Sequence, residues 1–190
     1  MNPNSTVAKT SELTGSAVRA QVLWVITFAV ATAAGARFEI PNTPVPFTLQ
    51  TLVVLLAGAF LGPRNGALSQ LVYLGAGVAG LPVFAGGAWG LARLLGPTGG
   101  YLLAFPLAAY VAGLMTQKGK SLPWLALSFA TSLLVVFVSG TLYLFGVYTH
   151  DFGGAVVSGF LIFSWWDLLK LGASTMIYHE LARRWPRLPA

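Results

Sequence analysis

Asp167 and Lys170 are the only two charged residues inside the long apolar runs of this 190-residue chain. Because a charge at bilayer depth costs roughly 2.5–3.5 kcal/mol on insertion scales, a chain that keeps two of them needs a reason. On a helix, both residues share one face with Phe163 and Ser174, at spacings of i, i+4, i+7 and i+11. We therefore expect this stripe to point inward, toward a polar cavity or the rest of a helix bundle.

The pair places a carboxylate acceptor beside an ammonium donor, about 5–6 Å apart on one helix face. A small neutral heterocycle that carries N–H and C=O groups could be held between them. The alternative is an internal ion pair that only lowers the cost of membrane insertion, although two apolar residues would cost less still. The spacing leaves both interpretations open.

Further candidate ligand contacts lie near the ends of the apolar runs. Arg93, in an apolar connection, could meet a ligand carboxylate or a lipid headgroup. Thr48 and Gln50 begin the second run, where Gln50 is either a ligand contact or a hydrogen bond between helices. Four aromatic residues could line an apolar pocket: Phe47, Phe84, Trp89 and Tyr101. Aromatic residues at this depth more often form the interfacial belt or the core.

Several kinds of chemistry are excluded. The sequence has no GxxxxGK[ST] phosphate loop and no HExxH motif, and the absence of cysteine excludes disulfides and thiolate metal sites. An intramembrane enzyme that used Asp167 as an acid or base would need a second titratable group at the same depth, and only Lys170 is available. Binding therefore fits better than catalysis, and we expect neither an enzyme nor a bound metal or cofactor.

The composition is that of an integral membrane protein. Hydrophobic residues make up 56% of the chain and charged residues 8%, against about 25% charged in soluble domains. A net charge of +6 could indicate nucleic acid binding. The positions of the charges instead favour a topology signal, so contact with membrane lipid is expected and contact with nucleic acid is not.

The apolar pattern predicts an all-α fold, a compact bundle of six transmembrane helices within residues 20–180. Residues 1–19 are expected to form a cytoplasmic tail and not a signal peptide, and residues 181–190 a basic cytoplasmic tail. Spans two and three are short for helices that cross lipid. The predicted spans are Val22–Ala36, Phe47–Leu61, Ala67–Ala79, Gly100–Met115, Leu122–Val147 and Gly154–Tyr178.

The basic residues orient this bundle. With six spans, the side that holds both termini carries Lys9, Arg19, Arg64, Lys118, Lys120, Arg183, Arg184 and Arg187. The opposite connections carry only Arg37 and Arg93. Because cytoplasmic loops are enriched in Lys and Arg, both termini are predicted to be cytoplasmic.

Two outward connections have unusual compositions. Residues Arg37–Pro46 contain three prolines, and residues Leu81–Gly96 are apolar but rich in glycine. Non-helical backbone of this kind is tolerated near a membrane where it is buried in protein or lines a cavity. We expect the two connections to form a lid over the outward end, the alternative being ordinary surface loops.

Ala29 and Ala33 in the first span form a small-xxx-small pair, which permits close approach of another helix. From the residues alone, packing within the chain and docking on another subunit are equally compatible with the pair.

Together these features resemble the BioY family, the biotin-binding S components of energy-coupling factor (ECF) transporters. The resemblance rests on the Asp167/Lys170 pair and on three strings that cover about a third of the chain. The strings are PVPFTLQTLVVLLAGAFLGPRNGALS (Pro44–Ser69), YLGAGVAGLPVFAGG (Tyr73–Gly87) and LLGPTGGYLLAF (Leu94–Phe105).

The resemblance implies high-affinity biotin binding and uptake across a bacterial or archaeal cytoplasmic membrane. It implies that Asp167 and Lys170 bind the ligand, that ATPase subunits act through a transmembrane coupling protein, and that Ala29 and Ala33 dock on that protein. Biotin's ureido N–H groups suit Asp167, and its carboxylate suits Arg93, although Lys170 and Arg93 could exchange roles. The alternatives are an S component for another vitamin, an intramembrane enzyme that uses Asp167, and a purely structural subunit.

Overall fold

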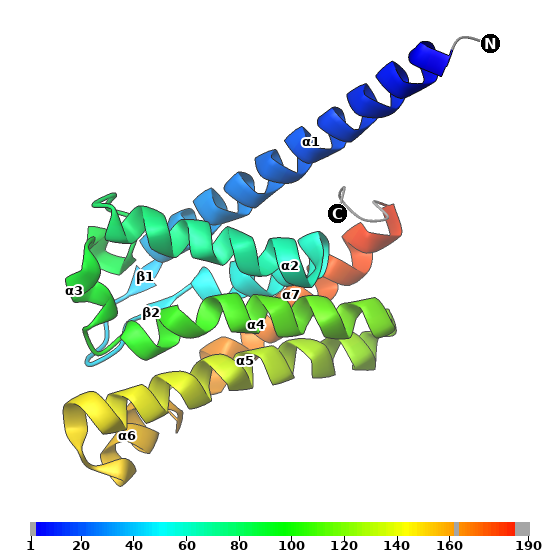
Figure 1. The fold of residues 1–190 in the computed structure, drawn as a ribbon. Coiled ribbons are helices and arrows are strands. Elements are labelled where there is room, and N and C mark those ends of the chain that lie inside the picture. Colours follow the sequence, from blue (N-terminus) through cyan, green and yellow to red (C-terminus); the bar gives the residue numbers. More distant parts are fainter. Residues whose placement is uncertain (1–2, 162–163, 185–190) are drawn as a thin grey trace.

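The computed structural model describes residues 3–161 and 164–184, and the side chains of residues 18–161, 165–182 and 184. The described chain is mainly helical, with a two-stranded antiparallel ladder in which Ile40 lies opposite Phe47 and several short connections. The elements (Figure 1) are α1 (Pro3–Arg37), β1 (Glu39–Ile40), β2 (Phe47–Thr48), α2 (Gln50–Val78), η1 (Ala85–Gly87), α3 (Leu91–Leu94), α4 (Gly99–Lys118), α5 (Leu122–Leu144), η2 (Phe145–Thr149), α6 (Phe152–Gly159) and α7 (Ser164–Arg184).

Helix α2 is a hairpin of two helical arms. Gly62 has φ 78° and ψ 177°, a conformation that only glycine adopts readily, and Pro63 follows it at a position where a helix can begin without an N–H group. The arms lie in backbone contact, because a Cβ atom on Gly66 would stand 2.7 Å from the Cα of Gly58. The two arms therefore run antiparallel (Figure 1) and correspond to the predicted second and third spans.

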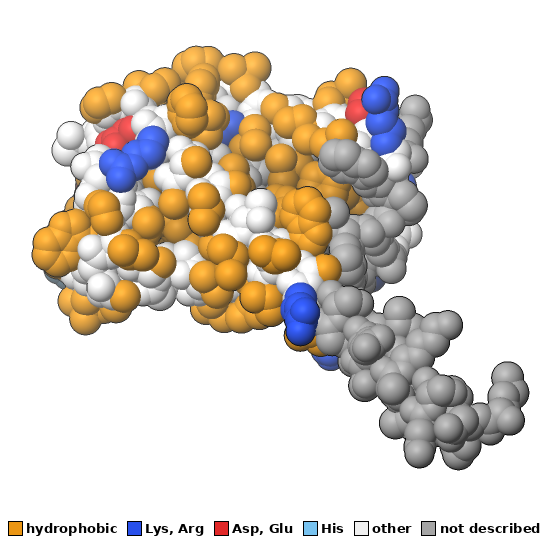
Figure 2. Space-filling model, turned by 90° about the horizontal axis from the view of Figure 1, so that it is seen from above, with side chains coloured by type: hydrophobic (Ala, Val, Ile, Leu, Met, Phe, Trp, Pro, Cys, Tyr) orange, Lys and Arg blue, Asp and Glu red, His pale blue; other side chains and the backbone are white. Residues whose placement is uncertain are grey.

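Four helical stretches are long and apolar enough to cross a membrane: Val18–Arg37, Gln50–Val78, Gly99–Lys118 and Leu122–Thr149. Apolar side chains cover most of the face in Figure 2. The expected all-helical, multi-pass membrane architecture is therefore confirmed, while the count of six spans stays a prediction.

The predicted sixth span, Gly154–Tyr178, is wrong as a single helix. Helix α6 ends at Gly159, and α7 begins at Ser164. The carbonyl of Gly159, the last residue of α6, accepts a hydrogen bond of 2.8 Å from the Tyr101 hydroxyl. This bond joins the end of α6 to α4.

Two other boundaries differ from the sequence prediction. Phe47 and Thr48 belong to a strand rather than to the second span, and α2 begins at Gln50. Helix α1 begins at Pro3, so the expected N-terminal tail is helical and continuous with the first span. The division into tails and membrane domain at residues 19 and 180 stays a prediction.

Helix α4 packs between α2 and α5, and α7 packs against both α2 and α5. The start of α1, the end of α7 and the turn between α4 and α5 lie at one end of the bundle (Figure 1). The strands, α3 and α6 lie at the other end. The core between the ends consists of aromatic and aliphatic side chains, among them Tyr73, Phe84, Phe105, Leu125 and Phe129. This arrangement brings α7 beside the start of α2.

Candidate ligand-binding site

A cavity lies between the start of α2, the segment around α3, and helices α4, α5 and α7. Its atom-free space, which includes the open mouth, is about 510 Å³. It is narrow, since only about 50 Å³ is open to the centre of a water molecule. The cavity is lined by Val45, Pro46, Thr48, Gln50, Thr51, Ala85, Arg93, Thr98, Tyr101, Leu102, Phe105, Val136, Phe137, Asp167 and Lys170. A bicyclic ligand would therefore require some of these side chains to move apart.

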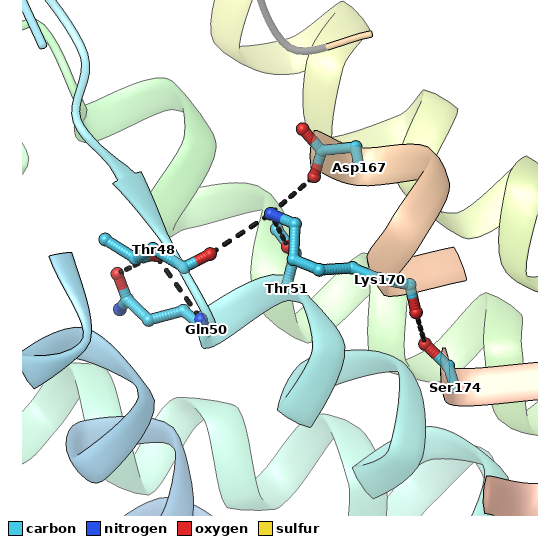
Figure 3. Close-up of polar contacts among 6 residues, drawn as sticks. All are labelled: Thr48, Gln50, Thr51, Asp167, Lys170 and Ser174. Carbon is cyan, nitrogen blue, oxygen red and sulfur yellow. Dashed lines mark hydrogen bonds and ion pairs between the residues drawn. The ribbon is translucent and has the colours of Figure 1, made fainter. Parts of the chain in front are cut away.

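Asp167 and Lys170 form an ion pair at one wall of the cavity. Oδ1 of Asp167 lies 2.5 Å from Nζ of Lys170. The ammonium also donates hydrogen bonds to the Thr48 carbonyl (3.1 Å) and to Oγ1 of Thr51 (2.7 Å), as Figure 3 shows. Two hydrogen bonds and the ion pair thus give the ammonium three oxygen contacts, which hold the lysine against the start of α2.

The Asp167 carboxylate is much less satisfied than its partner. Both charged residues are 4% exposed, so neither reaches bulk solvent. Oδ1 contacts the ammonium and the carboxylate interacts with the Thr51 hydroxyl, but neither carboxylate oxygen meets hydrogen-bond geometry with a described residue. A carboxylate offers about four lone-pair positions, so this buried acceptor has capacity for N–H groups of a ligand.

The inward stripe predicted on this helix is confirmed for its described members. Asp167, Lys170 and Ser174 are buried, whereas Trp165 and Leu168 are more than 60% exposed. The Ser174 hydroxyl donates to the carbonyl of Lys170, one turn back. Phe163, the fourth member of the stripe, lies outside the described residues.

A second polar wall comes from the segment that joins α3 to α4. Arg93 lies in α3, its Nε is buried without a hydrogen-bond partner, and its guanidinium forms no ion pair within the part of the chain whose side chains are described. Thr98, the N-cap residue of α4, also has a buried hydroxyl without a partner. The charges of Asp167 and Lys170 neutralise each other, so the positive charge of Arg93 is the one left without a counter-charge among the residues that line the cavity. The cavity therefore suits an anionic ligand.

Six of the nine ligand contacts expected from the sequence line this cavity: Thr48, Gln50, Arg93, Tyr101, Asp167 and Lys170. Gln50 also makes the expected hydrogen bond between helical segments. Its Nε2 donates to the Tyr73 hydroxyl (2.6 Å), and its Oε1 accepts from the Thr48 hydroxyl (3.0 Å). The two interpretations of Gln50 are therefore compatible. Ligand contact by any of the six stays a prediction.

Three expected contacts lie elsewhere, among the residues that do not line the cavity. Phe84 is fully buried in the core, where its ring packs edge-to-face on Tyr73 at a centroid distance of 5.6 Å and against Gly77, which has no side chain to obstruct it. Trp89 is 62% exposed. Phe47 packs against the edge of the core. Aromatic character alone did not distinguish pocket walls from core and surface.

Sequence reasoning missed Thr51, Thr98 and the apolar walls from α4 and α5. The sequence did contain a signal for Thr51. It lies three residues after Thr48, a predicted ligand contact, at a spacing that puts two residues on one face of a helical turn, and α2 starts between them. Thr98 had one too, because a threonine before a Gly-Gly pair at the start of a span is a typical helix N-cap. Phe105, Val136 and Phe137 resemble every other apolar residue of the spans, and only the packing places them here.

Ala29 and Ala33 lie on the face of α1 that packs into the bundle. Ala29 is buried and Ala33 partly buried, both against the same core cluster. The exposed face of α1 instead carries Val22, Ile26 and Val30. These contacts favour the packing interpretation of the small residues, and docking on a coupling protein stays a prediction.

Comparison with known proteins places the chain in a family. The sequence model of the BioY family matches residues 6–187. "Biotin transporter BioY" of Thermotoga maritima is 40% identical over 149 residues, covering 78% of this chain and 88% of that protein. "Probable biotin transporter BioY" of Pyrococcus horikoshii is 40% identical over 161 residues, covering 85% and 95%.

The fold is similar to a solved structure described as the S-component for biotin from an ECF-type ABC transporter. The TM-score is 0.80 at 23% sequence identity, with 96% of this chain and 95% of the other covered. At this identity the likeness concerns the fold. The family match spans nearly the whole chain, and the chain therefore belongs to the BioY family.

Proposed function

We propose that this protein binds biotin and takes it up across the membrane as the substrate-specific component of an ECF-type importer. The observation that carries the proposal is the pairing, in one cavity, of an under-satisfied carboxylate with an uncompensated guanidinium. Biotin has the matching groups, a neutral ureido ring with two N–H donors and a carboxylate at the end of an apolar chain. Relatives named biotin transporters support the assignment.

In this proposal Asp167 accepts the ureido N–H groups. Lys170, held by Thr48 and Thr51, fixes the position of the carboxylate, and it meets the ureido carbonyl by exchanging one of its three oxygen contacts for it. Leu102, Phe105 and Val136 enclose the bicyclic ring and the alkyl chain. Arg93 meets the ligand carboxylate. The chain performs no chemistry on the ligand, in line with relatives that are named transporters.

The test is calorimetry of biotin binding to the purified protein in detergent, with Asp167→Asn as the variant. We expect the substitution to weaken binding at least about 100-fold, because an amide is uncharged, has one acceptor oxygen in place of two and adds a donor of its own. No binding by the folded natural protein would remove the biotin assignment, and other vitamins would then be screened. Equal binding by both proteins would leave Asp167 a structural ion-pair partner.

We further propose six membrane crossings, with both termini in the cytoplasm and the two arms of α2 counted as separate crossings. The absence of cysteine makes this directly testable, because single cysteines can be introduced without removing any. Cysteines placed at Lys118 and at Asn42 should be labelled by an impermeant maleimide from opposite sides of the membrane. Labelling of both from one side would contradict the topology.

The two connections beside the cavity are proposed to act as a lid. Val45 and Pro46 from the first and Ala85 from the second line the cavity, and Arg37 at the end of α1 donates a 2.5 Å hydrogen bond to the Pro82 carbonyl. Because the cavity is narrow, entry of biotin requires these walls to separate.

Energy is proposed to come from ATPase subunits through a transmembrane coupling protein. Transport that survives bulky substitution of Ala33 would exclude docking at that residue.

A further inference from the structure

Thr98 is unusual among the hydroxyl groups of this bundle. Most Ser and Thr residues within the helices bond to the carbonyl four residues earlier, as Thr27, Thr32, Thr116, Ser128, Thr131, Ser132, Ser158, Ser174 and Thr175 do. This local bond satisfies a hydroxyl in an apolar environment. Thr98 precedes α4 and does not make this bond, and the carbonyl four residues earlier, that of Leu94, accepts a hydrogen bond from the Tyr143 hydroxyl (3.3 Å). Its hydroxyl is buried without a hydrogen-bond partner, at 7% exposure for the residue.

Thr98 stands at the N-cap of α4, but its side chain does not cap the helix. An N-cap threonine normally accepts a hydrogen bond from an N–H group in the first turn of its helix. Thr98 has φ −85° and ψ −6°, and its side chain makes no capping bond. Among the described residues Thr141 also has a buried hydroxyl, but it interacts with the Tyr101 hydroxyl at Gly159 and does not line the cavity.

Three features of one wall suit an anion. Thr98 and Arg93 both line the cavity, and each has a buried polar atom without a partner. Thr98 also begins α4, a helix of 20 residues whose first turn points its N–H groups and the positive end of its dipole toward this region. A buried donor without an acceptor costs free energy unless a ligand supplies one.

We propose that Thr98 is a specificity-determining residue, whose hydroxyl donates a hydrogen bond to the carboxylate of the ligand beside Arg93 and the N-terminus of α4. The inference rests on the proposed function and deepens it. Arg93 supplies the charge, whereas Thr98 supplies a short, directional donor that an ionised ligand fills and an esterified ligand fills poorly. The site thereby selects the free acid over neutral derivatives.

The test compares Thr98→Val with the natural protein, using biotin and biotin methyl ester as probes in calorimetry. Valine keeps the shape of threonine and removes its hydroxyl. We expect biotin affinity to fall about tenfold, ester affinity to change less than about twofold, and Thr98→Ser to restore most of the preference for the acid. Thr116→Val, which removes a buried hydroxyl bonded within α4 and outside the cavity, should leave both affinities unchanged.

Different results distinguish the failures. If the natural protein binds biotin and Thr98→Val binds it equally well, or loses both ligands in equal measure, the role of Thr98 is wrong while the biotin assignment stands. If the natural protein is folded and binds neither ligand, the proposed function fails, and the role of Thr98 fails with it. Thermal unfolding of each variant in detergent separates loss of binding from loss of folding, and Thr98→Ser provides the second test should the valine variant unfold.

Discussion

Two buried polar clusters lie within this apolar bundle, and they differ in how completely they are satisfied. At the interface of α1 and α2, Thr32, Gln70 and Ser69 are all 0% exposed. Oγ1 of Thr32 lies 3.2 Å from Oε1 of Gln70, Nε2 of Gln70 donates to Ser69 (3.0 Å), and Ser69 donates to the Gly66 carbonyl (2.7 Å). Every side chain of this cluster has its partner within the chain.

The cavity cluster is only half satisfied. Lys170 has three acceptors, whereas Asp167, Arg93 and Thr98 each keep buried polar atoms without hydrogen-bond partners among the described residues. Buried polar groups without partners are costly in a membrane. The satisfied cluster at α1 and α2 (the closed cluster) carries no such cost and needs no explanation beyond packing. The cavity cluster (the open cluster) carries the cost, so packing alone does not explain it. The contrast teaches that burial of polar groups does not mark a site in this protein. Buried polar atoms that line a cavity and can still form hydrogen bonds are the better indication of a candidate ligand site.

The largest effect is expected for Lys170→Met. It removes the ammonium and leaves Asp167 buried without compensation, so we expect biotin affinity to fall at least about 100-fold and stability to fall by roughly 3–5 kcal/mol. Calorimetry and thermal unfolding in detergent measure the two effects. Addition of Asp167→Asn should recover much of the stability and none of the binding. Recovery of binding by the double variant would mean that the ion pair is only structural.

A smaller effect is expected for Thr51→Val. The substitution removes one acceptor of the Lys170 ammonium and loosens the lysine without removing a charge. We expect biotin affinity to fall about fivefold to tenfold, the equivalent of about 1–1.4 kcal/mol. Thr131→Val is the matched control, because Thr131 is a partly buried threonine whose hydroxyl bonds within α5 and which does not line the cavity. Equal titration curves for all three proteins would remove Thr51 from the site.

A substitution in the closed cluster should lower stability and leave biotin affinity nearly unchanged, so its effect on binding is the smallest of the three. Gln70→Leu deletes the contact of Gln70 with Thr32, while Thr32 keeps its 2.8 Å bond to the Phe28 carbonyl and Ser69 its bond to Gly66. We expect stability to fall by about 0.5–2 kcal/mol and biotin affinity to stay within about twofold. A loss of affinity comparable to that of Thr51→Val would show that the two clusters are coupled, and the comparison would then fail.

Much of the fold was predictable because it depends on composition and local pattern. The apolar content indicated a helical membrane protein, and Gly62-Pro63 marked the reversal between the arms of α2 that the separate second and third spans anticipated. The break between α6 and α7 was not predictable. The end of α6 at Gly159 accepts a hydrogen bond from the Tyr101 hydroxyl, 58 positions earlier in the sequence, and no local pattern contains that contact.

The inward face of α7 was determined by the sequence alone, because the helical period puts Asp167, Lys170 and Ser174 on one side and the membrane penalises charges on the other. Which groups stand opposite that face was decided only by tertiary structure. Thr51, Thr98 and Phe137 come from three different helical regions, and each resembles many residues that lie elsewhere. Phe84 and Trp89 show the reverse case, since one packs onto Gly77 in the core and the other faces outward. Periodicity decides the direction in which a side chain points, and only packing decides what it meets there.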